Sequence, residues 1–340
     1  MGPEAGNLYR KDVFPMYMFN EAATTAAAAA SSEPFIPNSN LIIAGATAVI
    51  LVLMAVAAFF FLKSHAKNWG NALVYGLLAG VAFIALVPML LSALITLIPS
   101  WAEFMTTNNR ANQIISVVLQ FVVTCAAFIV GMILLKRSGE KTHQTTDLSS
   151  GVMFGFGIFM VELFIGQQLS FCLQYIPFCM SLNDVGYDAA IANAVEQGIS
   201  EAEAIEQLNS IAAIDVMDYF VYPSIILALK AVLDVCAGAL AYGTVTAKFP
   251  KAVYALLIGI FAVTFGSNAL ASLKIFNSLT YIIIIAVLAV LSVVLTVRIV
   301  QKYIPDEWDD FKTIKTGSTS GFPRKDKTPP KMPKINMPKE

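Results

Sequence analysis

The chain has 340 residues, of which 57% are hydrophobic and only 13% are charged, and its formal net charge is −1. Soluble domains carry about 25% charged residues, so this composition excludes an ordinary water-soluble fold and predicts an all-α polytopic membrane protein. The mean hydropathy of +0.69 points the same way. We expect contact with a lipid bilayer, and neither a nucleic acid nor a nucleotide as a partner.

Seven segments are apolar over enough residues to cross a bilayer, which takes about 20 residues of helix. The predicted spans are residues 41–62, 72–98, 114–135, 151–176, 219–246, 252–273 and 279–297. The second span contains Pro88, and proline removes a hydrogen bond from a helix, so we expect this helix to kink or tilt. The sequence therefore predicts a seven-transmembrane-helix bundle over residues 41–298.

The distribution of basic residues predicts how the bundle is oriented, because short cytoplasmic loops are enriched in Lys and Arg. Of the 22 Lys and Arg, 17 follow the first, third, fifth and seventh spans. Only Arg10, Lys11, Arg110 and Lys274 fall on the opposite side, and Lys230 lies within a span. We therefore expect the N-terminus outside and the C-terminus in the cytoplasm.

Three segments outside the predicted spans have compositions of their own. Residues 1–40 are too polar and then too rich in alanine for a signal peptide, and we expect an extracytoplasmic arm. Residues 299–340 are basic and rich in Pro and Lys, which predicts a disordered cytoplasmic tail. Residues 183–218 contain eight acidic residues and no Lys or Arg, and they form the one sizeable insertion between spans.

A helical hairpin is expected within this acidic insertion. Gly198 can end one short helix, and Ser200 with Glu203 fits the S-x-x-E capping box that starts another. Such an extracytoplasmic hairpin is either a cap folded over the bundle or a docking surface for a basic partner.

Three ionisable residues fall at a similar depth inside the predicted membrane region. Glu162 lies roughly 16 Å from the cytoplasmic end of the fourth span, and Lys230 and Asp234 lie near that depth in the antiparallel fifth span. Lys230 and Asp234 are four residues apart on one helix face and can pair. A charge at the bilayer centre costs about 2.5–3.5 kcal/mol. We therefore expect all three residues to form an intramembrane polar cluster. The cluster either fixes helix packing or is a functional site, for the movement of an ion or proton or for a chemical reaction.

Small residues surround Glu162 in the fourth span, where Gly151, Gly155 and Gly157 predict close helix packing. The two histidines and four cysteines do not suggest a disulfide scaffold, a metal site or a cofactor. A bridge between Cys172 and Cys179 requires the intervening helix to break at Pro177, and the sequence leaves this question open.

The run GFGIFMVE at residues 155–162 fits the pattern G-x-G-x-x-x-x-E. It resembles a helix motif of the YhfC family of bacterial intramembrane proteases, and the resemblance extends over roughly residues 70–275. The resemblance implies a multi-pass protein of the bacterial cytoplasmic membrane, and it would make Glu162 the centre of a peptidase.

The chain departs from that family where catalysis is concerned. Ile158 occupies the position of the motif's histidine, the span at 114–135 lacks the family's paired glutamates, and Lys230 stands where a later helix of the family carries histidine. The two histidines, His65 and His143, fall in predicted cytoplasmic loops. Activating water takes a carboxylate with a partner or a metal ion, so we expect no catalytic residue here.

Three functions are compatible with these residues. The first is a non-catalytic scaffold or accessory subunit derived from a protease-like bundle, with a membrane-protein partner. The second is a small-solute or proton-coupled transporter that uses Glu162, Lys230 and Asp234. The third is a divergent intramembrane protease centred on Glu162.

Overall fold

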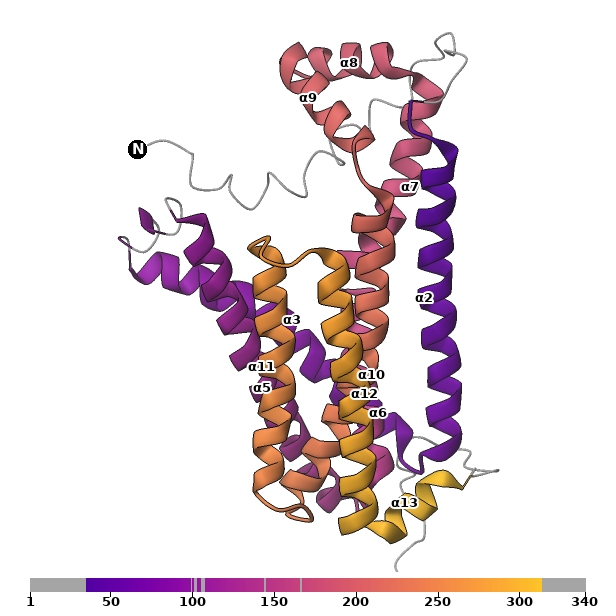
Figure 1. Ribbon diagram of the computed structural model, residues 1–340, viewed down its shortest axis with the longest axis vertical. Coiled ribbons are helices and arrows are strands. Elements are labelled where there is room, and N and C mark those ends of the chain that lie inside the picture. The colour runs from indigo at the N-terminus through magenta and orange to yellow at the C-terminus, as the bar shows by residue number, and fades with distance from the viewer. Residues whose placement is uncertain are drawn as a thin grey trace, which may run out of the picture.

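The computed structural model describes residues 35–98, 100, 103–104, 108–143, 145–165 and 167–313. Over these ranges the chain is helical without strands, and seven segments are long and apolar enough to cross a membrane. They are Asn38–His65, Trp69–Leu97, Arg110–Thr142, Leu148–Val185, Met217–Val245, Ala252–Ser272 and Ser278–Tyr303. The predicted all-α seven-helix bundle is confirmed (Figure 1).

The first three spans are single helices, named α2 (Asn38–His65), α3 (Trp69–Leu97) and α5 (Asn109–Thr142). Pro88 lies inside α3, and α3 and α5 run obliquely to α2 (Figure 1). Only six of the 28 residues of α2 and six of the 29 residues of α3 are buried in the isolated chain, as expected for helices that face lipid.

The fourth predicted span is two helices, which corrects the single helix expected over 151–176. Helix α6 (Leu148–Phe164) ends within the apolar run, and α7 (Gln167–Val185) continues outward. Hydropathy does not reveal this break because the residues on both sides are apolar, although Gly166, a poor helix former, lies between them in the sequence. The helix α7 packs against α2 at the outer end of the molecule (Figure 1).

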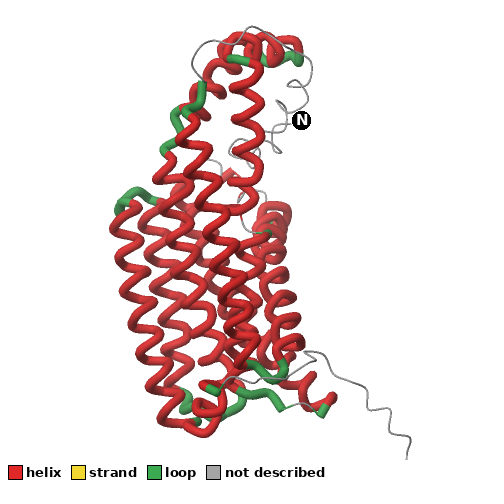
Figure 2. The backbone as a smooth tube through the Cα atoms, turned by 90° about the vertical axis from the view of Figure 1, so that its right-hand side faces the viewer, coloured by secondary structure: helices red, strands yellow, loops and turns green. Residues whose placement is uncertain are grey.

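Helix α6 lies at the centre of the bundle, where 14 of its 17 residues are buried. It packs most extensively against α3 and α10 (Tyr222–Val245). A five-residue π-helix, η3 (Met217–Val221), leads directly into α10. The last two spans, α11 (Ala252–Ser272) and α12 (Ser278–Tyr303), pack against α10, and the bundle is seen from a second side in Figure 2.

The outer insertion is a helical hairpin of α8 (Tyr187–Glu196) and α9 (Glu201–Ala212). Gly198 ends the first helix with φ +88°, a conformation that favours glycine. The hydroxyl of Ser200 accepts a hydrogen bond from the Glu203 amide at 3.3 Å, as predicted for the cap. The cap consists of this Ser200 bond, and the side chain of Gln207 donates a hydrogen bond to the Glu203 carboxylate at 3.4 Å.

Part of the region expected to be a disordered tail, residues 299–340, is helical. Residues to Tyr303 belong to α12, and a further short helix, α13 (Pro305–Lys312), packs against α12 and α6. Trp308 and Phe311 give α13 an apolar face that packs against the core. These two residues are three positions apart, but four acidic residues surround them, so the amphipathic pattern was not recognised in the sequence. The tail beyond residue 313 and the arm over residues 1–34 lie outside the described residues.

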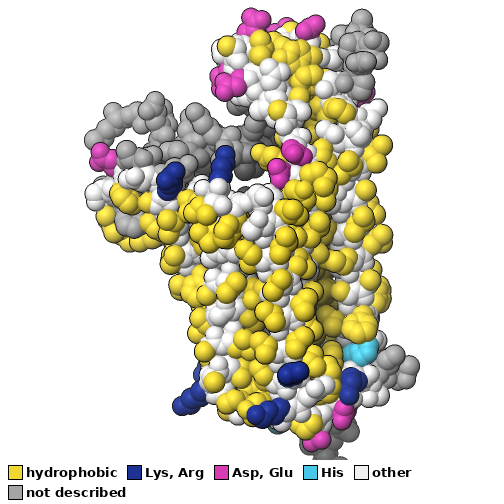
Figure 3. Space-filling view, in the orientation of Figure 1, with side chains coloured by type: hydrophobic (Ala, Val, Ile, Leu, Met, Phe, Trp, Pro, Cys, Tyr) yellow, Lys and Arg dark blue, Asp and Glu magenta, His cyan; other side chains and the backbone are white. Residues whose placement is uncertain are grey.

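Charged side chains are distributed unevenly between the two ends of the molecule. Figure 3 shows acidic side chains on the α8–α9 hairpin and basic side chains around the opposite end, with acidic residues of α13 beside them. The basic end holds the connections after α2, α5 and α10, which is the distribution from which the sequence predicts a cytoplasmic face.

Candidate functional site

The site is built where α6 crosses α10 with almost no space between their backbones. A Cβ atom on Gly155 would collide with the backbone carbonyl of Asp234, and one on Gly151 would lie 2.5 Å from Cβ of Tyr242. On the opposite face of α6, a Cβ atom on Gly157 would lie 2.8 Å from the carbonyl oxygen of Leu73 in α3. The three predicted packing glycines therefore let α6 lie close to two helices at once.

This close packing brings two of the predicted charges together. Nζ of Lys230 in α10 donates a hydrogen bond to Oε2 of Glu162 at 2.6 Å, which makes a charge-assisted ion pair across the helix crossing. The two side chains are only 24% and 12% exposed, respectively. Glu162 lies in the last turn of α6, directly before the interruption that separates α6 from α7.

Asp234 is the third member of the predicted cluster, but its environment differs from that of Glu162. The residue is 4% exposed, and its Oδ2 atom is buried with no hydrogen-bond partner among the described residues. The ion pair with Lys230 that the four-residue spacing suggested is not formed, because Lys230 reaches across to Glu162 instead. Asp234 still lies close enough to interact electrostatically with both residues.

Tyr281 adds a polar group that the sequence reasoning missed. It comes from α12, is nearly buried, and interacts electrostatically with Lys230 and Glu162. The phenol lies in the first turn of an apolar span, where tyrosine usually reads as an interfacial anchor. Only the packing of α12 on α10 identifies it as a neighbour of the cluster.

The histidines and cysteines lie apart from this cluster. His65 is the last residue of α2 and is 8% exposed, so the loop position predicted for it is wrong. His143 is exposed at the end of α5, as expected of a loop residue. Cys172 and Cys179 are free thiols on α7, which continues through Pro177 and keeps them two turns apart.

No group of three or more His, Cys, Asp or Glu side chains in the described ranges is placed to hold a metal ion. The cluster of Glu162, Lys230 and Asp234 contains one cation and two carboxyl groups. It can fix the register of two helices, and its second carboxyl group could take up a proton or a small cation.

A second polar contact joins α13 to the N-terminal end of α6 and the C-terminal end of α10. Glu307 Oε2 accepts hydrogen bonds from the Leu148 amide at 2.9 Å and from the Tyr242 hydroxyl at 2.8 Å. Lys248 forms an ion pair with the same carboxylate and a hydrogen bond with Tyr242. We call this set of Glu307, Leu148, Tyr242 and Lys248 the α13 latch.

No family model, no curated protein and no solved structure matches this chain.

Proposed function

We propose that the chain is a non-catalytic membrane scaffold or accessory subunit, with a bundle derived from an intramembrane protease of the YhfC type. We place it in the bacterial cytoplasmic membrane with its N-terminus outside. The observation that carries the proposal is the closed ion pair between Lys230 and Glu162.

A catalytic base must offer its carboxylate to a water molecule or substrate within hydrogen-bonding reach. In this chain one oxygen of Glu162 is held by Lys230 at 2.6 Å, and Ile158 replaces the histidine that the family motif would supply. The carboxylate at the centre of the motif therefore has a partner that neutralises it, and it supports a packing role for the motif.

The energetics of the pair agree with such a role. Removing one member of a buried ion pair leaves an uncompensated charge and costs about 3–5 kcal/mol. Glu162 and Lys230 stand on the two helices that carry the close glycine contacts, so the pair also selects the register in which those contacts form.

The outer hairpin supports the accessory role. The eight acidic residues of the insertion over residues 183–218, five of them in the hairpin itself, are all exposed, and no Lys or Arg lies among them: Asp184, Asp188, Glu196, Glu201, Glu203, Glu206, Asp215 and Asp218. Complementary charge steers association and selects partners, so the expected partner presents a basic extracytoplasmic surface.

A charge exchange tests the scaffold proposal. Glu162→Lys alone should prevent accumulation in the membrane, and the double variant Glu162→Lys with Lys230→Glu should restore it, because the pair is reformed with opposite polarity. A co-expressed membrane substrate reports proteolysis in the same cells. If the wild type cleaves it and Glu162→Gln, although still accumulating, does not, the scaffold proposal fails and the divergent protease is supported.

Proton-coupled transport is a second candidate, and Asp234 favours it. A purely structural cluster would satisfy its buried polar atoms, yet Oδ2 of Asp234 has no partner in the described part of the chain. The cluster also lies beside the interruption between α6 and α7, and interrupted helices form the binding sites of many transporters.

Infrared difference spectroscopy of the purified chain, recorded across a pH titration, tests this candidate. A carboxylic acid band that changes with pH and disappears in Asp234→Asn would support proton uptake by Asp234. The matched control is Glu206→Gln in the exposed hairpin, which should retain the band. Failure to find a band that depends on Asp234 would exclude the residue as a proton carrier.

A further inference from the structure

Three hydrogen-bond donors from outside α13 converge on the carboxylate of Glu307. Its Oε2 atom accepts from the Leu148 amide at 2.9 Å and from the Tyr242 hydroxyl at 2.8 Å, which is shorter than the 3.2 Å contact of that hydroxyl with the Thr146 carbonyl. Its Oε1 atom accepts from the ammonium group of Lys248. Proteins bind carboxylates with such sets of amide, hydroxyl and cationic donors, so the arrangement is a carboxylate site and more than an ion pair.

The start of α6 leaves a place for this carboxylate. The first amides of a helix have no partner within the helix, and the partial positive charge there favours an anion. Asp147 caps α6, and its Oδ1 atom accepts hydrogen bonds from the Ser150 amide and from the hydroxyls of Ser149 and Ser150. The Leu148 amide donates to Glu307 instead. Glu307 therefore satisfies a donor that the cap of α6 does not reach.

The helix that supplies Glu307 lies on the surface of the bundle and is held by few contacts. None of the eight residues of α13 is buried, and Ile304, with φ −140° and ψ 57°, separates α13 from α12. A helix of this length is marginal in water, so α13 depends on docking for its structure. The side chains of Lys248 and Glu307 are 35% and 25% exposed. The contact is therefore within reach of a competing ligand from solvent.

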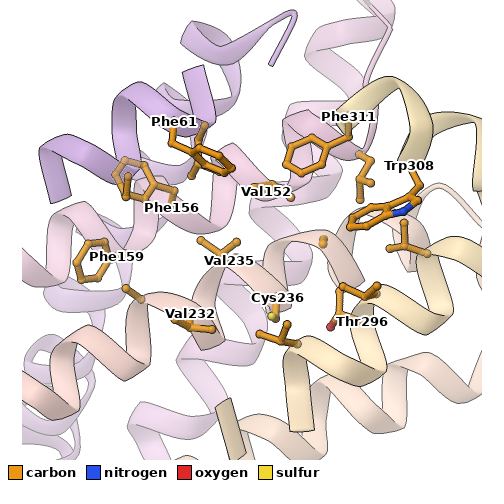
Figure 4. A pocket seen from close by; sticks show the side chains of 18 of the residues that line it. Phe61, Val152, Phe156, Phe159, Val232, Val235, Cys236, Thr296, Trp308 and Phe311 are labelled. Carbon is orange, nitrogen blue, oxygen red and sulfur yellow. The ribbon is translucent and has the colours of Figure 1, made fainter. Parts of the chain in front are cut away.

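The docked α13 also shows what lies beside the carboxylate site. Trp308 and Phe311 lie at one end of an apolar pocket whose walls include Phe61 and Val152 (Figure 4). Trp308 directly follows Glu307 in the sequence, so one short helix presents a carboxylate and an apolar face together. The ligand that matches both features is an acidic amphipathic helix, which lays its apolar face against a hydrophobic surface.

We propose that Leu148, Tyr242 and Lys248 form a binding site for a carboxylate of an acidic amphipathic helix on a partner protein, and that α13 occupies this site as a built-in ligand. The site lies at the end of the bundle that the sequence predicts to face the cytoplasm. A tethered ligand acts at a millimolar effective concentration, so α13 blocks the site until another ligand displaces it. The inference goes beyond the scaffold role and does not depend on it, because no residue of the site belongs to the Glu162 cluster.

Acetate tests the carboxylate site, because Glu307→Ala removes Cγ and the carboxyl group, which acetate replaces atom for atom. In the full chain in detergent, acetate should raise the melting temperature of Glu307→Ala saturably, with a Kd on the order of 10 mM. The wild type, whose site is filled, should not respond, and neither should the matched control Asp306→Ala at the exposed neighbouring acid. Chloride at the same ionic strength is the reference.

The double variant of Glu307→Ala with Lys248→Met lacks the cation and should bind acetate about tenfold more weakly than Glu307→Ala alone. Equal acetate binding by the two variants, or no response of Glu307→Ala to acetate, would overturn the proposal.

A labelled synthetic peptide of residues 304–313 tests whether α13 can be exchanged for a ligand from outside the chain. It should bind Glu307→Ala about tenfold more tightly than it binds the wild type, and a peptide with Gln in place of Glu307 should lose this affinity. An excess of the first peptide, but not of the Gln peptide, should also speed amide exchange of residues 305–312 in the wild type, which requires no variant of the bundle.

Three results of the peptide experiments would overturn the proposal. Equal binding of the two peptides to Glu307→Ala would mean that the apolar face alone is recognised. Equal binding of the first peptide to the wild type and to Glu307→Ala would mean that α13 does not occupy the site. Unchanged amide exchange in the wild type with excess peptide would mean that α13 cannot be displaced.

Discussion

Nζ of Lys230 lies 2.6 Å from Oε2 of Glu162, although the two residues are 68 positions apart in the chain. The contact forms because glycines let the backbones of α6 and α10 lie close together. The small residues and the two opposite charges are therefore found at the same helix crossing. The charge of Glu162 is thereby compensated inside the bundle, which explains how an apolar helix tolerates it.

Removing either charge should therefore destabilise the bundle. We expect Glu162→Gln and Lys230→Met each to lower the free energy of unfolding by about 3–5 kcal/mol, because each leaves the other charge buried and unpaired. Removing both should cost less than the sum of the single effects. Unfolding in mixed micelles measures all three variants.

The control for this prediction is the exposed pair of Lys312 and Asp309 in α13. Replacing Lys312 with Met should change the unfolding free energy by less than about 1 kcal/mol, since surface pairs contribute little. If the buried and the exposed pair lost similar amounts of unfolding free energy, the claim that the buried pair stabilises the bundle more strongly would be contradicted.

Glycines at the α6–α10 crossing should not tolerate even a methyl group. Gly155→Ala and Gly238→Ala place Cβ against backbone atoms of the facing helix, and we expect each to cost about 1–3 kcal/mol through overpacking. Gly259→Ala and Gly266→Ala in α11 meet nothing within 4 Å. These controls should be neutral or gain about 0.5–1 kcal/mol from the helix preference of alanine. Thermal unfolding of the four variants compares the glycines of the helix crossing with those of α11. Equal changes in stability in the two pairs would refute the packing argument.

The α13 latch should depend on Glu307. Its carboxylate accepts hydrogen bonds from Leu148 and Tyr242 and pairs with Lys248, and a hydrogen bond to a charged group contributes about 1.5–3 kcal/mol. Glu307→Ala should therefore release α13, which hydrogen exchange of residues 305–312 would show as faster exchange. Asp306→Ala, at the exposed neighbouring position, should leave the exchange unchanged. Slow exchange in Glu307→Ala would mean that the apolar face alone holds the helix.

The exposed contact between Lys67 and Asp310 should add a pH dependence to the attachment of α13. The hydrogen bond from Lys67 to Asp310, at 2.8 Å, raises the pKa of Lys67 above its ordinary value. A raised lysine pKa stabilises the folded contact fully below the unfolded pKa, and the contribution is lost as pH rises through the folded pKa. We therefore consider the ratio of the α13 exchange rate in Lys67→Met to the rate in the wild type. This ratio should exceed one at neutral pH and approach one in strongly alkaline buffer. A ratio that is independent of pH would exclude this contribution.

The positions of the spans were predictable because each depends on local composition. Residues 252–273 were predicted to span the membrane, and the structure has a helix over Ala252–Ser272. Hydropathy does not report where a helix pauses inside an apolar run, so the division between α6 and α7 was missed. Hydropathy also does not detect short amphipathic helices, so the residues of α13 were assigned to the tail.

The class of protein, the seven membrane spans and the shared depth of Glu162, Lys230 and Asp234 follow from composition and helix rise, so they could be read from the chain alone. The pairing of Lys230 with Glu162, which leaves the Oδ2 atom of Asp234 without a partner among the described residues, emerges only from the folded bundle. The depth of a residue depends on its own helix, whereas the choice of a partner depends on how two helices are rotated against each other. That rotation is set at the α6–α10 crossing by the glycines that admit the facing backbone.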